Sequence, residues 1–68
     1  MKYSVEFERE EDDRWIAEVP DLPGVMVYGA TREEAFRKVE ALALRVLADR
    51  IEHGEFPPGS LSLSFEAA

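Results

Sequence analysis

The longest pattern in the chain is an apolar stripe with helical period between Thr31 and Gly54. Thr31 followed three residues later by Glu34 forms a capping box, and the acids of the first turn favour the positive end of a helix dipole. Gly54 is suited to the left-handed residue that ends a helix. The apolar positions that share one face are Ala35, Phe36, Val39, Leu42, Ala43, Val46 and Leu47. The pattern therefore predicts one long amphipathic helix.

Four short segments are expected to be strands, because apolar residues alternate with polar ones or lie between turn residues. They are residues 2–8 (KYSVEFE), 14–19 (RWIAEV), 25–28 (VMVY) and 60–65 (SLSLSF). In the last segment we expect Leu61, Leu63 and Phe65 to face inward. The order of elements predicts a single α+β domain over residues 1–68, β-β-β-α-β, with a four-stranded mixed sheet and one long helix on one face. Three strands form a meander, and the last strand joins the first in parallel.

The helix is expected to extend beyond this sheet. About 22 helical residues span roughly 33 Å, whereas a typical strand spans about 17–20 Å. Its C-terminal turns are therefore predicted to project into solvent or onto another subunit.

Turn chemistry is concentrated before the third strand and before the helix. The segment between the second and third strands consists of Pro20, Asp21, Leu22, Pro23 and Gly24. Pro20 ends the strand because it has no N–H, and Pro23 with Gly24 is typical of a tight turn. We expect both Gly24 and Gly29 to adopt backbone conformations that are costly for a residue with a Cβ.

Two apolar surfaces remain uncovered in this arrangement. One is the open sheet face with Ile16, Met26 and Tyr28, and the other is a second helical stripe around Leu44. A chain of 68 residues without cysteine buries little surface and has no disulfide to stabilise it. We therefore expect a homodimer or a higher homo-oligomer that uses one of these two surfaces. Trp15 is interpreted as a core or sheet-face aromatic, with a binding anchor as the alternative.

The net charge is −7, from 15 acidic residues and 8 lysines and arginines. Such a chain is poorly suited to nucleic acid or anionic membrane, because phosphate contacts need a basic surface. A basic protein partner is favoured instead. The run Glu10, Glu11, Asp12 and Asp13 in the predicted hairpin turn is the candidate partner-binding site. A polar N-terminus and the lack of a long apolar run indicate a cytoplasmic protein.

No catalytic, cofactor-binding or metal-binding residue is expected. Paired carboxylates can bind Mg²⁺ or transfer protons, but charge runs in turns are usually solvated. His53, the single histidine, complements the negative end of the helix dipole more simply than it catalyses. The alternative is a minimal acid-dependent nuclease that uses Asp12 or Asp21.

These motifs together resemble those of the HicB-like antitoxins. The family pattern is W-x-A-x-x-P-D-L-P-G followed by G-x-T-x-x-E-A at the start of a helix. Here the first part is residues 15–24 (WIAEVPDLPG), and the second begins at Gly29 and includes Thr31 and Glu34. The resemblance covers roughly residues 3–51. It implies a fold like a truncated ribonuclease H core without that enzyme's catalytic acids.

The resemblance also implies a partner, the small basic HicA toxin, which cleaves mRNA and whose active surface the antitoxin covers. Many family members carry a C-terminal ribbon-helix-helix or helix-turn-helix that binds operator DNA. This chain ends at Ala68, so no direct DNA binding is expected. The sequence thus favours a non-enzymatic module that binds and occludes a HicA-type toxin. The alternative is an orphan oligomeric regulator that binds a small ligand or another protein.

Overall fold

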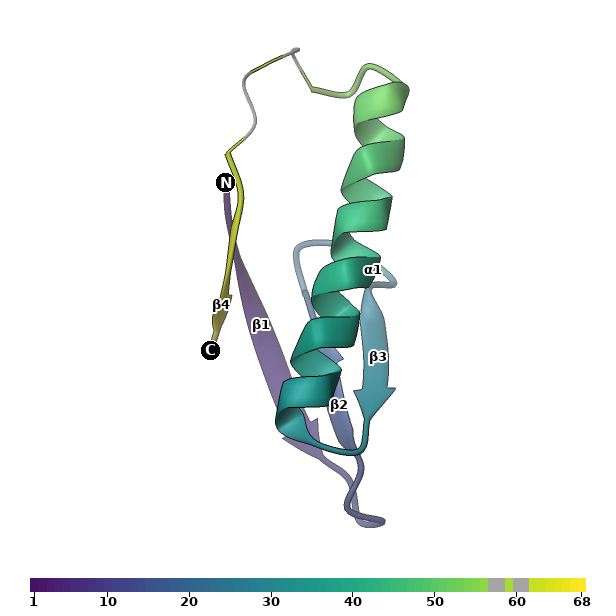
Figure 1. Ribbon diagram of the computed structural model, residues 1–68, viewed down its shortest axis with the longest axis vertical. Coiled ribbons are helices and arrows are strands. Elements are labelled where there is room, and N and C mark those ends of the chain that lie inside the picture. Colours follow the sequence, from purple (N-terminus) through teal and green to yellow (C-terminus); the bar gives the residue numbers. More distant parts are fainter. Residues whose placement is uncertain (57–58, 60–61) are drawn as a thin grey trace.

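The computed structural model describes residues 1–56, 59 and 62–68 and shows an α+β arrangement of one sheet and one helix (Figure 1). The elements are β1 (Lys2–Arg9), β2 (Trp15–Glu18), β3 (Met26–Gly29), α1 (Arg32–Glu52) and β4 (Ser64–Ala67). The sheet order is β3-β2-β1-β4, in which β4 is parallel to β1 and the other pairs are antiparallel. The predicted fold class and strand arrangement are confirmed.

The last strand begins later in the chain than predicted. β4 starts at Ser64, opposite Lys2 at the beginning of β1, and pairs as far as Ala67. A strand that began earlier would have no partner, because β1 itself begins at Lys2. Leu63 and Phe65 are half-buried on the core side, whereas residues 60 and 61, including Leu61, lie outside the described residues.

Helix α1 covers β2 and β3, and the core lies between them. The helix continues past the ends of these strands, so its C-terminal turns stand beyond the sheet, as its length predicted (Figure 1). The buried hydrophobic residues come from β1, β2, α1 and the β2–β3 connection. They are Tyr3, Val5, Ala17, Val19, Leu22, Val25, Ala35, Val39, Ala43 and Leu47.

The N-terminus of α1 is capped by the side chain of Thr31. Thr31 Oγ1 accepts a hydrogen bond from the N–H of Glu34 at 3.0 Å, as the capping box predicted. The Glu34 carboxylate lies 2.8 Å from Lys38 Nζ. The Lys38 hydrogen bond, followed by the Ala30 N–H, holds the pKa of Glu34 below its ordinary value.

The C-terminus of α1 ends in a Schellman motif around Gly54, whose φ is 74°. The N–H of Glu55 donates to the Arg50 carbonyl at 2.9 Å, and the N–H of Gly54 donates to the Ile51 carbonyl at 3.0 Å. Glycine is required here because other residues rarely adopt this conformation, and the predicted left-handed helix end is confirmed.

Gly24 and Gly29 are needed for two different reasons. Gly24 has a φ of 83°, and a Cβ there would meet nothing within 4 Å, so the predicted unusual conformation is confirmed. The same prediction is wrong for Gly29, whose φ is not positive. A Cβ at Gly29 would lie 2.5 Å from the backbone nitrogen of Ala35. Gly29 therefore lets the first turn of α1 approach the end of β3 closely.

The open face of the sheet as a candidate binding site

The sheet face opposite α1 is formed by alternate residues of three neighbouring strands. The register places Glu6 of β1 opposite Glu18 of β2, and Glu18 opposite Met26 of β3. The next row along the strands contains Glu8, Ile16 and Tyr28 in the same order. Carboxylates thus lie over β1 and β2, and apolar side chains lie towards β3. We call this surface the open face.

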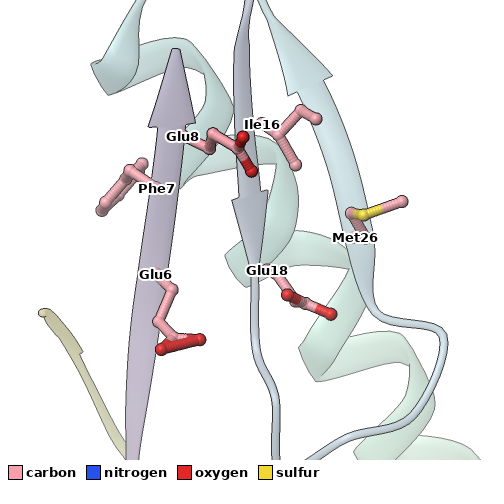
Figure 2. Close-up of a pocket in the computed structure, with 6 residues that line it drawn as sticks. All are labelled: Glu6, Phe7, Glu8, Ile16, Glu18 and Met26. Carbon is pink, nitrogen blue, oxygen red and sulfur yellow. The ribbon is translucent and has the colours of Figure 1, made fainter. Parts of the chain in front are cut away.

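The open face has a shallow hollow of about 360 Å³. Figure 2 shows Glu6 and Glu8 projecting from β1, Glu18 and Ile16 from β2, and Met26 from β3. Phe7, which also lines the hollow, points away from these side chains and packs on Phe36 of the helix with ring centroids 5.7 Å apart. The hollow is therefore bordered by acids on one side and by apolar groups on the other.

The three acids of the open face lack compensating charge. Within residues 1–56, 59 and 62–68, no cationic group forms an ion pair with Glu6, Glu8 or Glu18. By contrast, Glu66 on β4 lies 3.4 Å from Lys2 Nζ. Like charges directly opposite on adjacent strands destabilise a sheet, and Glu6 and Glu18 form such a pair. The arrangement suits a cationic partner, which would remove the repulsion.

The apolar part of the open face is exposed to solvent. Met26 and Tyr28 are 48% and 44% exposed, and Ile16 beside them is half-buried. The guanidinium carbon of Arg14 lies 4.5 Å from the centroid of the Tyr28 ring and covers part of it. Trp15 is half-buried on the opposite face against the core, which agrees with its interpretation as a core aromatic.

The predicted partner-binding acids lie in the β1–β2 turn, and two of them are already paired. Asp12 Oδ2 accepts from Arg14 Nε at 2.7 Å, and Asp13 Oδ1 accepts from the Arg9 guanidinium at 2.8 Å. Asp12 also accepts from the backbone N–H of Arg14, and this bond is the main cause that lowers its pKa. Glu10 and Glu11 line a separate shallow hollow beside them. Asp12 and Asp13 therefore stabilise the hairpin turn through these contacts.

The four predicted interface residues fall on two separate surfaces. Ile16, Met26 and Tyr28 lie together on the open face. Leu44 lies on α1, on the other side of the molecule, where it is 44% exposed and Ile51 is 43% exposed. An interface between two copies that uses the open face therefore leaves Leu44 outside it, and an interface that uses Leu44 leaves the other three residues outside.

The motif residues before β3 have a structural role. Leu22 is 1% exposed, and its N–H donates to the Val19 carbonyl at 3.0 Å. The N–H of Val25 then donates to the Leu22 carbonyl at 3.0 Å, which closes the turn. Pro20, Asp21 and Pro23 are exposed around it, so the segment joins β2 to β3 and anchors Leu22 in the core.

Sequence reasoning missed the acids of the open face. Their signal was present in the polar positions of the 2–8 and 14–19 alternation, but only the strand register shows that Glu6 and Glu18 are opposite one another. The run of turn acids was more conspicuous because its members are consecutive.

Comparisons with protein-family profiles, with curated proteins and with solved structures find no match for this chain. Among the described residues, no three histidine, aspartate or glutamate side chains are grouped so that they could hold a metal ion. In the same part of the chain, no helix is long and apolar enough to cross a membrane.

Proposed function

We propose that this chain is a non-enzymatic antitoxin-type module that binds and occludes a small, basic, mRNA-cleaving toxin of the HicA type. The observation that carries the proposal is the open face, where three carboxylates without an ion pair to any described residue border an exposed apolar strip. The β-β-β-α-β order and the positions of the Trp15–Gly24 and Gly29–Ala35 motifs agree with the resemblance to HicB-like antitoxins.

The distribution of charge supports a basic partner on the sheet side. Residues 1–29, which form the three antiparallel strands and their connections, contain eight acids and three lysines or arginines. The helix, residues 32–52, contains five of each. An RNA-binding surface rich in lysine and arginine would therefore be attracted to the sheet and not to the helix.

The two parts of the open face have different roles in this mechanism. Glu6, Glu8 and Glu18 would raise the rate of association, because electrostatic complementarity mainly steers the encounter. Met26 and Tyr28 would slow dissociation by burying apolar surface on the partner. The bound antitoxin would block the RNA groove of the toxin without doing chemistry. Association is then expected to slow as salt rises, while the dissociation rate changes little.

Co-expression with a HicA-type toxin tests the proposal. Wild type should restore growth, and Glu6→Gln, Glu8→Gln and Glu18→Gln combined should weaken the rescue. The matched control carries the same kind of change at the turn acids, Glu10 to Asp13. We expect a smaller loss from the control, because two turn acids are already neutralised by Arg9 and Arg14.

Binding rates of the purified proteins should follow the same order at low salt. If wild type neither rescues growth nor binds the toxin at low salt, the antitoxin function is wrong. The orphan-regulator alternative would then be favoured. If the turn acids matter and the open-face acids do not, the toxin binds at the hairpin.

A further inference from the structure

Strand β3 is an edge strand whose free side has a defined hydrogen-bonding pattern. Val19 lies opposite Val25 across the β2–β3 ladder, and its N–H donates to the Val25 carbonyl at 3.0 Å. Antiparallel strands alternate in this respect, so Val25, Val27 and Gly29 direct their backbone groups to β2. Met26 and Tyr28, between them, direct theirs away from the sheet.

Three of these outward groups are available to a partner strand. The N–H of Met26 donates to the Gly24 carbonyl at 3.2 Å. The Met26 carbonyl and both backbone groups of Tyr28 make no hydrogen bond with any other described residue. Edge strands are usually protected by charge or proline, yet residues 25–28 are VMVY and have neither.

We propose that a second copy of this chain pairs with β3 in an antiparallel arrangement whose two-fold axis passes beside Val27. In this register Met26 of one copy faces Tyr28 of the other. The N–H of Tyr28 then donates to the Met26 carbonyl of the second copy, and the symmetric bond forms as well. On the helix side, half-buried Val27 meets its own counterpart. The interface is self-complementary, as a two-fold interface must be.

A neighbouring register, with Tyr28 on the axis, would place Tyr28 opposite its own counterpart and Met26 opposite Ala30. Charges introduced at Met26 and Tyr28 distinguish the two registers, because in this one any charge at residue 28 meets an identical charge.

Charge explains why a second copy uses this edge and not the open face. Each copy carries a net charge of −7, so two copies repel wherever their acids meet. Stacking two open faces would bring Glu6, Glu8 and Glu18 against their counterparts. Pairing through β3 places Met26 and Tyr28 at the junction, with Glu18 one strand away and Glu6 and Glu8 two strands away.

The pairing also has a consequence for the proposed function, although it does not depend on it. The exposed strips of the two copies would join into one central apolar strip with acids on both sides. Ile16 would flank this strip without taking part in the strand contact. Leu44 would lie outside the interface.

Proline substitution tests the proposed hydrogen bond directly. Tyr28→Pro removes an N–H that β2 does not use, whereas Tyr28→Ala removes the same side chain and keeps the N–H. Light scattering of the full chain at micromolar concentration should show twice 7.7 kDa for wild type and for Tyr28→Ala, with Tyr28→Pro at 7.7 kDa. Circular dichroism confirms that each variant is folded. Equal masses for the two variants, or a monomeric wild type, would overturn the inference.

Charge pairs test the register even if proline unfolds the strand. Met26→Glu combined with Tyr28→Glu places like charges opposite one another in the proposed dimer and should dissociate it. Met26→Glu combined with Tyr28→Lys places opposite charges there and should retain it. Dissociation of both double variants, or of neither, rejects this register. A dimer that shows the expected pattern but binds no toxin would uphold the inference and reject the proposed function.

Discussion

Gly29 provides the most direct test of how α1 is seated on the sheet. A Cβ at this position would lie 2.5 Å from the Ala35 nitrogen and 2.8 Å from its Cα, both backbone atoms of the helix. Real Cβ contacts are essentially never shorter than 3.0 Å, so the helix or the end of β3 must move by about 0.5 Å or more. Gly29→Ala therefore strains packing that involves the whole first turn of α1.

The magnitude follows from two opposing effects. Overpacking of this kind costs about 1–3 kcal/mol. Replacing glycine also restricts the unfolded chain, which returns about 0.4–1 kcal/mol. The net loss for Gly29→Ala is therefore about 1–2 kcal/mol, or a fall in Tm of roughly 5–15 °C for a domain of this size. Urea unfolding followed by Trp15 fluorescence, at one fixed protein concentration, measures the loss.

Gly24 is the matched control, because a side chain at this position would be disfavoured by the backbone conformation and not by a steric clash. At φ 83° with nothing within 4 Å, asparagine is tolerated better than alanine despite its size. At Gly29, where space is the limit, alanine should be tolerated better than asparagine. The order of stability should therefore reverse between the two positions. The same order at both positions, or a Gly29→Ala variant as stable as wild type, would refute the steric argument.

Three further predictions concern the helix cap and the sheet. Thr31→Ala should destabilise the protein by about 1 kcal/mol in thermal unfolding, because the cap is lost, while Thr31→Ser should be nearly neutral. Since Lys38 holds the pKa of Glu34 below its ordinary 4.5, the stability that this group contributes is present above pH 4.5 and is lost as the pH falls through the folded-state value. Glu34→Gln should therefore flatten the acid side of the stability–pH curve, and an unchanged slope would contradict this. Glu18→Gln should raise the urea midpoint, most clearly at low salt.

The helix and the strand order were predictable because each depends on local patterns. The helix N-cap at Thr31, the helix end at Gly54 and the alternation of residues 2–8 each depend on residues within one segment, and each was confirmed. The bounds of β4 were not predictable, because they depend on where β1 offers a partner. Lys2 begins β1, and the register from that residue sets the start of β4 at Ser64.

The candidate site was harder to predict because it depends on contacts between strands. The sequence indicated that Ile16, Met26 and Tyr28 share the outer face, and the structure confirms this placement. It did not indicate that Glu6 faces Glu18, which requires the register. The reason for Gly29 was also hidden, because the approach of Ala35 is a tertiary contact and leaves no local signal.

The opposed carboxylates link stability to binding in a way that one variant can measure. Glu6 and Glu18 repel across the β1–β2 ladder, so Glu18→Gln should stabilise the free protein and slow association with a basic partner. Added salt should reduce both effects, because it screens exposed charges. Glu66→Gln is the control with the opposite sign, since it removes the ion pair with Lys2. If Glu18→Gln lowers the urea midpoint as Glu66→Gln does, the carboxylates of the open face are not repelling one another. Repulsion between Glu6 and Glu18 could then no longer explain why the open face would prefer a cationic partner.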